Sequence, residues 1–487
     1  MNKFPSTRNL VVLAMILTSA AVIVLIFYND NPSVFQDTKI RNNSKTIIKS
    51  GYVKEYSLEK DTWPNGILVD SEGQVWVAGS KTYSLYKFDP FTDQTNTFKI
   101  KEPDGVTQDR PLMVWAMLED SNSTIWLSQF GTRSILLFDK NTKKFDEING
   151  LSHAPFQMKH DINENVWFTT TSTVGVVQKT PNFNTPYKIS EFQIGNNTHP
   201  TGLYLNGDAV WITDAVSQKI VQYKMVREDD HITNIVKILE LPLQNNTAFS
   251  YPTDIFVSGN NIWFTEHETN FITKYDVKTR TITRFPTSQS EYGVSTLPFW
   301  MRAVDNGSKI WFNEHEGNKI GLLDTSAKTL TEYEIPSRPS DGYVVYPLNI
   351  AIDPHNSNHL WFTELNTDKF GVIDANIPIP FSIQANTSKI MLKNSSTSNI
   401  DITLSKHKSL DTVRLFLNAS SSLDQAGGLF KIDSRFSKEY VDLNNDDEHV
   451  QLHLRSLDTP SGNFTLGISA SDGIVTKTIF VDLTIPN

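Results

Sequence analysis

The strongest constraint on the fold is a tryptophan that recurs in one local sequence frame through the middle of the chain. Successive tryptophans of this frame are separated by 50, 41, 44, 52, 48 and 50 residues. Repeats of about 40–50 residues built from several short strands are typical of β-propeller blades, whereas helical repeats show a hydrophobic period of about 3.6 residues. The frame holds seven of the ten tryptophans, in QVWVAG at Trp76, TIWLSQ at Trp126, NVWFTT at Trp167, AVWITD at Trp211, NIWFTE at Trp263, KIWFNE at Trp311 and HLWFTE at Trp361.

Each repeat has the same internal order. A proline-led apolar segment such as YPTDIFV from Tyr251 comes first, and a Gly/Asn/Asp turn and the tryptophan segment follow. Two further segments complete the unit, such as KIGLLD at 319–324 and TLTEYEIP at 329–336. Alternation of period two between turn residues predicts four antiparallel strands per repeat. We expect the tryptophans to pack between neighbouring blades and to take no part in chemistry.

The seventh repeat lacks its fourth segment, because it runs from KFGVIDA at 369–375 directly into Ile377-Pro378-Ile379-Pro380. A matching segment, GYVKEYSLE at 51–59, stands before the first repeat. If this segment completes the last blade, the ring closes and leaves no exposed inner edge. The sequence therefore predicts an all-β protein with a seven-bladed β-propeller over residues 51–376.

Residues 381–487 lack the tryptophan frame and contain alternating segments such as VQLHLRS and TKTIFVDLTI. Short strands at regular spacing over this length favour an immunoglobulin-like β-sandwich, here without the usual disulfide because the chain has no cysteine. Such a module more often serves as a spacer or adhesion unit than as an enzyme.

The N-terminus contains an uncharged apolar stretch, Leu10–Tyr28, long enough to cross a membrane once as a helix. We expect residues 1–28 to be an uncleaved membrane anchor, with 29–50 as a polar tether. The alternative is a signal peptide cleaved near Thr18–Ala21, which would make the protein secreted. In either case the soluble part is expected outside the cytoplasm, because no second span returns the chain.

Composition excludes several classes of function. The net charge is −10, which repels a phosphate backbone, so nucleic acid is not an expected partner. The absence of cysteine excludes thiolate metal sites and cysteine nucleophiles. The sequence also lacks the Gly-x-Ser-x-Gly, HExxH and phosphate-loop motifs.

The WFTE frame, followed by NKIG at 318–321 and DKFG at 368–371, resembles the streptogramin B lyase (virginiamycin B lyase) propeller family. The resemblance covers the propeller region and implies seven blades. It also implies magnesium-assisted elimination that opens a cyclic depsipeptide at its ester. In that family the chemistry rests on histidines directly after a blade-opening proline, on a Glu before such a proline, and on a Glu near the end of a tryptophan strand.

This chain departs from that pattern. The residues after its blade-opening prolines are Asn65, Leu112, Phe156, Thr201, Thr253, Phe299 and Leu348. The residues before these prolines are Trp63, Arg110, Ala154, His199, Tyr251, Leu297 and Tyr346. The family's histidines and its Glu before the proline are therefore missing from their positions, and Thr or Leu cannot replace a base that titrates near neutral pH. Whether the chain is an enzyme is left open at this point.

An acidic series does match the family, because a carboxylate stands three residues after the tryptophan in four successive repeats: Asp214, Glu266, Glu314 and Glu364. Two of them begin a repeated Glu-His-Glu tripeptide that contains His267 and His315, and His199 precedes a blade-opening proline. All seven side chains are candidates for a ligand-binding rim. Hard cations take oxygen ligands, so Glu266, Glu314 and Glu364 are candidates for a Mg²⁺ or Ca²⁺ site. The alternative is that each carboxylate accepts hydrogen bonds within its own blade and recurs because blades repeat.

Two functions from different classes follow. The first is a binding or adhesion module held at the membrane, which presents one rim to a small molecule, glycan or protein. The second is a magnesium-dependent carbon–oxygen lyase, or a lactonase-like enzyme, that uses the acidic rim.

Overall fold

A computed structural model describes residues 50–102, 111–180, 186–229, 231–242, 249–289, 295–339, 344–407, 412–423, 431–444, 447–457 and 459–486. The described chain is strand throughout, apart from turns and two 3-10 segments, η1 (Asp305–Gly307) and η2 (Leu365–Thr367). The predicted anchor and most of the tether lie outside the described residues. Within the described ranges no helix has the length and apolarity to cross a membrane.

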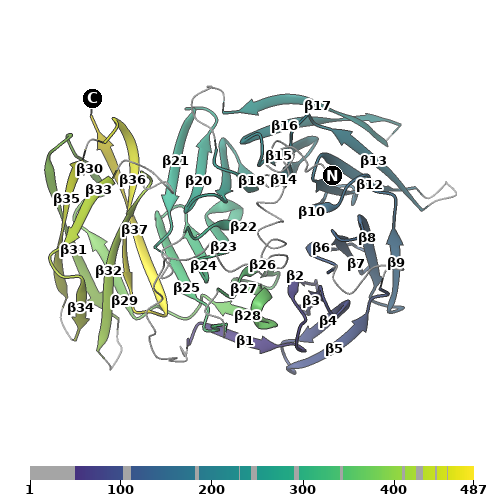
Figure 1. Ribbon diagram of the computed structural model, residues 1–487, viewed down its shortest axis with the longest axis horizontal. Coiled ribbons are helices and arrows are strands. Elements are labelled where there is room, and N and C mark those ends of the chain that lie inside the picture. The colour runs from purple at the N-terminus through teal and green to yellow at the C-terminus, as the bar shows by residue number, and fades with distance from the viewer. Residues whose placement is uncertain are drawn as a thin grey trace, which may run out of the picture. The chain divides into compact units, whose positions relative to one another are not determined.

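Seven four-stranded antiparallel units follow one another around a ring (Figure 1). Each innermost strand contacts the innermost strand of the next unit, and the last contacts the first, which closes the ring. These innermost strands are β2 (Pro64–Val69), β6 (Val114–Glu119), β10 (Pro155–His160), β14 (Pro200–Asn206), β18 (Pro252–Ser258), β22 (Pro298–Val304) and β26 (Pro347–Asp353). The arrangement is that of a β-propeller.

The other strands of each blade lie progressively farther from the centre. The tryptophan strands are β3 (Val75–Gly79), β7 (Thr124–Gln129), β11 (Val166–Thr170), β15 (Ala209–Asp214), β19 (Asn261–Glu266), β23 (Lys309–Glu314) and β27 (Asn356–Glu364). The third strands are β4 (Ser84–Asp89), β8 (Ser134–Asp139), β12 (Thr173–Lys179), β16 (Lys219–Glu228), β20 (Phe271–Asp276), β24 (Lys319–Asp324) and β28 (Lys369–Asp374). The outer strands are β5 (Gln94–Lys99), β9 (Lys144–Ile148), β13 (Tyr187–Gln193), β17 (His231–Leu241), β21 (Thr281–Pro286), β25 (Thr329–Glu334) and β1 (Val53–Ser57).

The first and last parts of the propeller join within the seventh blade, as the sequence predicted; we call this junction the seam. Strand β1 pairs antiparallel with β28, with Val53 opposite Ile373 and Ser57 opposite Lys369. The last blade therefore combines one strand from the start of the propeller with three from its end.

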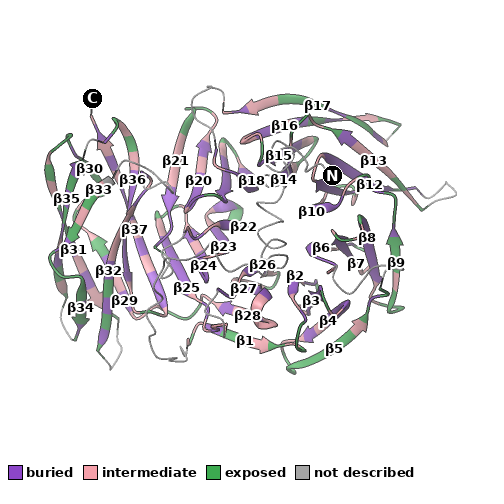
Figure 2. Cartoon of the chain, in the orientation of Figure 1, coloured by how far each residue is buried: buried purple, intermediate pink, exposed green. Residues whose placement is uncertain are grey.

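Burial explains the repeated tryptophan, because six of the seven pack into a cluster that includes core residues of the neighbouring blade. Trp76, for example, packs with Ile125 and Phe138 of the next blade. The tryptophan strands are accordingly buried along their length, whereas most outer strands carry exposed residues (Figure 2). The prediction that the tryptophans pack between blades is confirmed.

Three successive blades add a polar clamp that the sequence analysis missed. An aspartate six residues before the tryptophan accepts the indole N–H and pairs with a cation from the next blade. In the second blade Asp120 lies 3.1 Å from Trp126 Nε1 and 3.0 Å from Lys179 Nζ. The corresponding residues are Asp70, Trp76 and Lys140 in the blade before, and Asp161, Trp167 and Arg227 in the blade after.

The glycine of the NKIG and DKFG motifs has a packing reason. In the ladder between β23 and β24, Gly321 lies opposite Phe312, whose ring crosses over it. A Cβ atom on Gly321 would lie only 2.2 Å from Phe312 Cζ, well inside van der Waals contact. The pairs Phe168–Gly175 and Phe362–Gly371 repeat this arrangement in two other blades.

The C-terminal strands form two sheets. One is a separate four-stranded sheet, β29-β31-β35-β33, and the other continues outward from β25 through β37, β36, β32 and β34, with β30 beside β37. Thr329–Tyr333 of β25 pair with Val475–Ile479 of β37, so the outer edge of this blade is covered. The bounds are β29 (Phe381–Ala385), β30 (Lys389–Met391), β31 (Thr397–Lys406), β32 (Val413–Ser421), β33 (Lys431–Phe436), β34 (Tyr440–Leu443), β35 (Glu448–Leu457), β36 (Gly462–Ser471) and β37 (Val475–Ile485).

Candidate functional site

The candidate site lies where the innermost strands begin, which we call the entry rim. The first residue of each innermost strand pairs with the last residue of the neighbouring tryptophan strand. Pro252 thus lies opposite Glu266, and the pairs Pro200–Asp214, Pro298–Glu314 and Pro347–Glu364 repeat this register. The four carboxylates of the predicted acidic series therefore have equivalent positions at this end of their blades.

One sequence assignment at the entry rim is wrong. The proline pattern predicts that Pro111 opens the second blade, but β6 begins at Val114, which lies opposite Gln129. Met113 has the positive φ angle, 49°, that Leu297 and Tyr346 also have just before their strands. The residue equivalent to a family histidine is therefore Trp115 rather than Leu112, and the residue before the strand is Met113 rather than Arg110. Neither correction introduces a histidine or a Glu.

The carboxylates turn toward their own blades. Glu266 is fully buried and forms an ion pair with Arg284 of its outer strand, with 2.9 Å between Oε1 and Nε. It also accepts hydrogen bonds from the Thr273 hydroxyl at 2.7 Å and the backbone N–H of Ser250 at 3.2 Å. These contacts give Glu266 a structural role as a hydrogen-bond acceptor within its own blade.

Asp214 and Glu364 are also buried acceptors. Asp214 accepts the backbone N–H groups of His199 at 2.9 Å and Ser217 at 3.1 Å. Glu364 accepts the Thr367 hydroxyl at 2.6 Å. Burial, and to a lesser extent the nearby charge of Glu55, raises the pKa of Glu364 to about 8.

Glu314 differs from the other three. Its side chain is fully buried, and neither carboxylate oxygen has a hydrogen-bond partner among the described residues. Burial and the adjacent negative charge of Glu332 raise the pKa of Glu314 well above its usual range, against the smaller effect of Lys319. The surroundings of Glu314 thus favour the protonated carboxyl group, a form that can donate a hydrogen bond.

A cation held jointly by Glu266, Glu314 and Glu364 does not fit these contacts, because Glu266 and Glu364 are engaged within their own blades. In the part of the chain that the structure describes, no group of three or more His, Asp or Glu side chains could hold a metal ion.

The three predicted histidines lie among aromatic rings at the same rim. His267 and His315 stack with 5.4 Å between ring centroids and 12° between ring planes. Phe299 contacts both, at centroid distances of 4.7 Å and 5.5 Å. Phe299 stands at a position where the family has histidine, so two imidazoles from neighbouring loops flank that position.

Burial keeps these imidazoles neutral. It lowers the pKa of His267 to about 4, although His267 Nδ1 lies 3.4 Å from the carbonyl oxygen of Pro298. Burial and the adjacent His267 lower the pKa of His315 well below its usual range. Both ring nitrogens of His315 are buried, and neither has a hydrogen-bond partner among the described residues, so their hydrogen-bonding capacity is unused in this structure.

His199 completes the group. Its Nδ1 lies 3.3 Å from the Tyr251 hydroxyl, and burial lowers its pKa to about 4, against the nearby charge of Asp214. Tyr251 also contacts His267, and Tyr346 contacts His315 at a centroid distance of 5.2 Å. We call the six residues His199, Tyr251, His267, Phe299, His315 and Tyr346 the histidine collar. It offers neutral hydrogen-bonding groups and aromatic surface rather than charge.

The sequence analysis found the histidines of the collar but not its aromatic members. Tyr251 and Tyr346 were noted only as residues before a proline, and Phe299 only as the replacement of a histidine. A repeated aromatic residue just before the innermost strand is the signal that would have identified the two tyrosines.

Comparisons with known proteins agree with this fold. The model of the Virginiamycin B lyase family matches residues 108–390. No curated protein sequence matches the chain. A solved streptogramin B lyase structure superimposes with a TM-score of 0.52 at 22% identity, covering 66% of this chain and 96% of that one. Virginiamycin B lyase from Staphylococcus aureus gives a TM-score of 0.52 at 22% identity, covering 66% and 98%. A catalytically inactive form of it with quinupristin gives 0.50 at 24%, covering 66% and 98%.

Proposed function

The chain belongs to the virginiamycin B lyase family, and from that membership we propose that its propeller binds a ligand at the histidine collar without carrying out the family's elimination. The observation that carries this proposal is the set of residues one position into the innermost strands, where the family has its histidines. The set contains no histidine: Asn65, Trp115, Phe156, Thr201, Thr253, Phe299 and Leu348.

The chemistry of the collar suggests the ligand class. Its aromatic rings favour a ligand with apolar or aromatic surface, and the neutral imidazoles provide hydrogen bonds without demanding a charge. An uncharged, cyclic, peptide-like molecule with aromatic side chains meets both conditions. A glycan or a protein loop is the competing ligand class.

The remaining parts of the proposal concern location. We place the propeller outside the cytoplasm, tethered to the membrane by Leu10–Tyr28. The C-terminal sheets of residues 381–487 act as an immunoglobulin-like spacer. The support for this comes from the apolar N-terminal sequence and the strand pattern of the C-terminal segment.

Full-length protein in detergent, incubated with quinupristin and Mg²⁺, tests the proposal. We expect saturable binding by calorimetry and no ring-opened product by mass spectrometry. His315→Leu should weaken binding at least tenfold, whereas His449→Leu, at an exposed position in the C-terminal sheet, should not. Absence of binding would refute the ligand class, and multiple turnover would refute the loss of elimination.

A second candidate is a lyase with relocated groups. It is favoured by the two neutral imidazoles that flank Phe299 and by the buried carboxyl group of Glu314, whose pKa is raised by burial and by Glu332. A neutral imidazole can accept a proton and a carboxylic acid can donate one. A requirement for Mg²⁺ or Ca²⁺ stays part of this candidate. If ring opening is observed, its loss in Glu314→Gln and its response to a chelator would identify the groups involved.

A further inference from the structure

A second candidate site lies toward the far ends of the innermost strands, where Val69, Leu118 and Ile352 are among the residues that line it. Between it and the entry rim, Phe299 of the collar packs in an aromatic layer with three further buried residues: Trp115, Phe156 and Trp300. Phe156 contacts both Trp115 and Trp300, at centroid distances of 5.1 Å and 5.2 Å, and Trp115 contacts Phe299 at 5.9 Å. On the other side of this layer is a cavity of about 160 Å³.

The cavity walls are mainly apolar, with two cations among them. Ile67, Met117 and Ile350 contribute aliphatic surface, and Lys159 and Arg302 line the same space. Both cationic side chains are half-buried, so water reaches them. Burial, and then the adjacent Arg302, lower the pKa of Lys159 to about 8. Lys159 has no ion pair or hydrogen bond from its side chain to any described residue.

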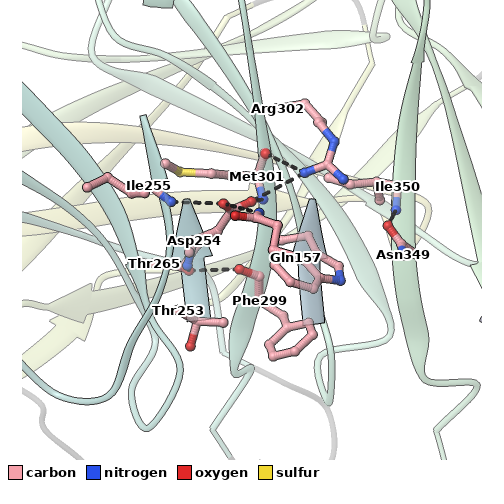
Figure 3. A network of polar contacts seen from close by, with 12 residues as sticks. Gln157, Thr253, Asp254, Ile255, Thr265, Phe299, Met301, Arg302, Asn349 and Ile350 are labelled. Atoms are coloured by element: carbon pink, nitrogen blue, oxygen red, sulfur yellow. Dashed lines mark hydrogen bonds and ion pairs between the residues drawn. The ribbon is translucent and has the colours of Figure 1, made fainter. Parts of the chain in front are cut away.

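The nearest carboxylate cannot balance both cations. Asp254 accepts hydrogen bonds from Gln157 Nε2 at 2.8 Å and from the backbone N–H groups of Ile255 and Met301, each at 2.9 Å. It also pairs with Arg302 Nη1 at 3.3 Å, as Figure 3 shows. Lys159 and Arg302 together carry two positive charges and Asp254 carries one negative charge, so this group of three has a net charge of +1.

The uncharged polar groups of the cavity wall already have partners. Asn349 and Gln157 line the cavity, but the amide oxygen and nitrogen of each are hydrogen-bonded, to groups that include Ile350 N and Asp254. The indole nitrogens of Trp115 and Trp300 are buried away from the cavity space. The polar group still free in the wall is therefore the cation Lys159, which requires an anionic acceptor.

The geometry points to a small aromatic monocarboxylate as the occupant of this cavity, with its carboxylate toward Lys159 and Arg302 and its ring against the apolar wall. An apolar cavity of about 150 Å³ is known to hold benzene, so a single ring with one carboxylate fits the volume. This inference does not depend on the proposed collar function, because none of the six collar residues lines the cavity.

Titration of the full-length protein with benzoate tests the inference, read by calorimetry and by tryptophan fluorescence. We expect saturable binding that is at least tenfold weaker for benzamide, the neutral analogue. Lys159→Met should also weaken benzoate binding at least tenfold, and Lys143→Met, at an exposed turn, should leave it unchanged.

Lys159→Gln removes the cation while retaining a polar side chain of similar reach, and should also weaken benzoate binding at least tenfold. This variant keeps the test available if Lys159→Met fails to fold. Equal binding of benzoate and benzamide, or of wild type and both variants, would overturn the anion site. Absence of saturable benzoate binding would do so as well. Quinupristin binding, measured in parallel, should be unaffected by Lys159→Met, which separates this site from the collar.

Discussion

The imidazole ring of His267 lies stacked on that of His315, with 5.4 Å between their centroids and only 12° between their planes. Two charged imidazoles at this distance in a buried site would repel each other and lose their hydration. The pair is therefore stable as two neutral rings, and the collar depends on their remaining unprotonated.

We predict that acid destabilises the fold between pH 6.5 and 4 through these histidines. The pKa of His267 is about 4 in the folded protein and 6.5 in the reference state, so the unfolded chain takes up protons first as the pH falls. The stabilisation is fully present above pH 6.5 and is lost toward pH 4. At pH 5 the loss is about 2 kcal/mol for His267.

Thermal unfolding of wild type and His267→Asn between pH 7.5 and 5 measures this effect. The decrease in melting temperature between pH 7.5 and pH 5 should be smaller for the variant than for wild type. Parallel curves for the two proteins would contradict the assignment. His199 has the same direction of shift and should behave in the same way.

Glu364 should show the opposite pH dependence. Its folded pKa of about 8 lies above the reference value of 4.5, so the folded state retains a proton that the unfolded state has lost. The stabilisation is complete below pH 4.5 and disappears as the pH rises through 8. Glu364→Gln should therefore melt close to wild type at pH 5 and be more stable at pH 9, on the order of 3 kcal/mol after allowing for Glu55. Exposed Glu72→Gln is the control, and an equal effect at both pH values would contradict the prediction.

Gly321→Ala should destabilise the sixth blade, because the added Cβ would lie 2.2 Å from Phe312 Cζ. Overpacking of this kind costs about 1–3 kcal/mol. Gly51→Ala is the matched control, since a Cβ there would meet no atom within 4 Å. Chemical denaturation of both variants provides the comparison, and similar midpoints for the two would show that Phe312 moves aside freely.

Asp120→Ala should remove an inter-blade clamp. The substitution leaves the Trp126 indole and Lys179 without their acceptor and also removes the hydrogen bond from the Thr124 backbone at 3.0 Å. Because Lys179 is partly exposed, the cost comes mainly from the buried indole N–H and is about 1–3 kcal/mol. Asp139→Ala, which removes only hydrogen bonds from its own turn, should cost less. Equal effects would mean that the contact with the next blade adds no stability.

The repeat made the ring and its seam predictable, because both follow from local strand patterns. The tryptophan frame fixes which strand lies second in each blade, and the match of 51–59 to an outer strand fixes the closure. The error at Pro111 has a physical reason. The start of an innermost strand requires the preceding backbone turn, seen in the positive φ of Met113, and does not require proline.

The site was less predictable because its contacts join different repeats. Sequence spacing placed Glu266 at the entry rim but could not show that Arg284, on the outer strand of the same blade, would turn its carboxylate away from the centre. Similarly, Phe299 and His267 belong to different blades, and their contact depends on the curvature of the whole ring.

The pairing of β37 with β25 has a practical consequence. A chain shortened to the propeller alone would expose the backbone of Thr329–Tyr333 as an unpaired strand edge. It would also lack Phe480, which packs against Phe285 in the hydrophobic core. Exposed edges of this kind recruit other strands and favour aggregation. The C-terminal sheets thus serve the propeller as a permanent cover, and a truncated protein is a poor substitute for the intact chain in any assay.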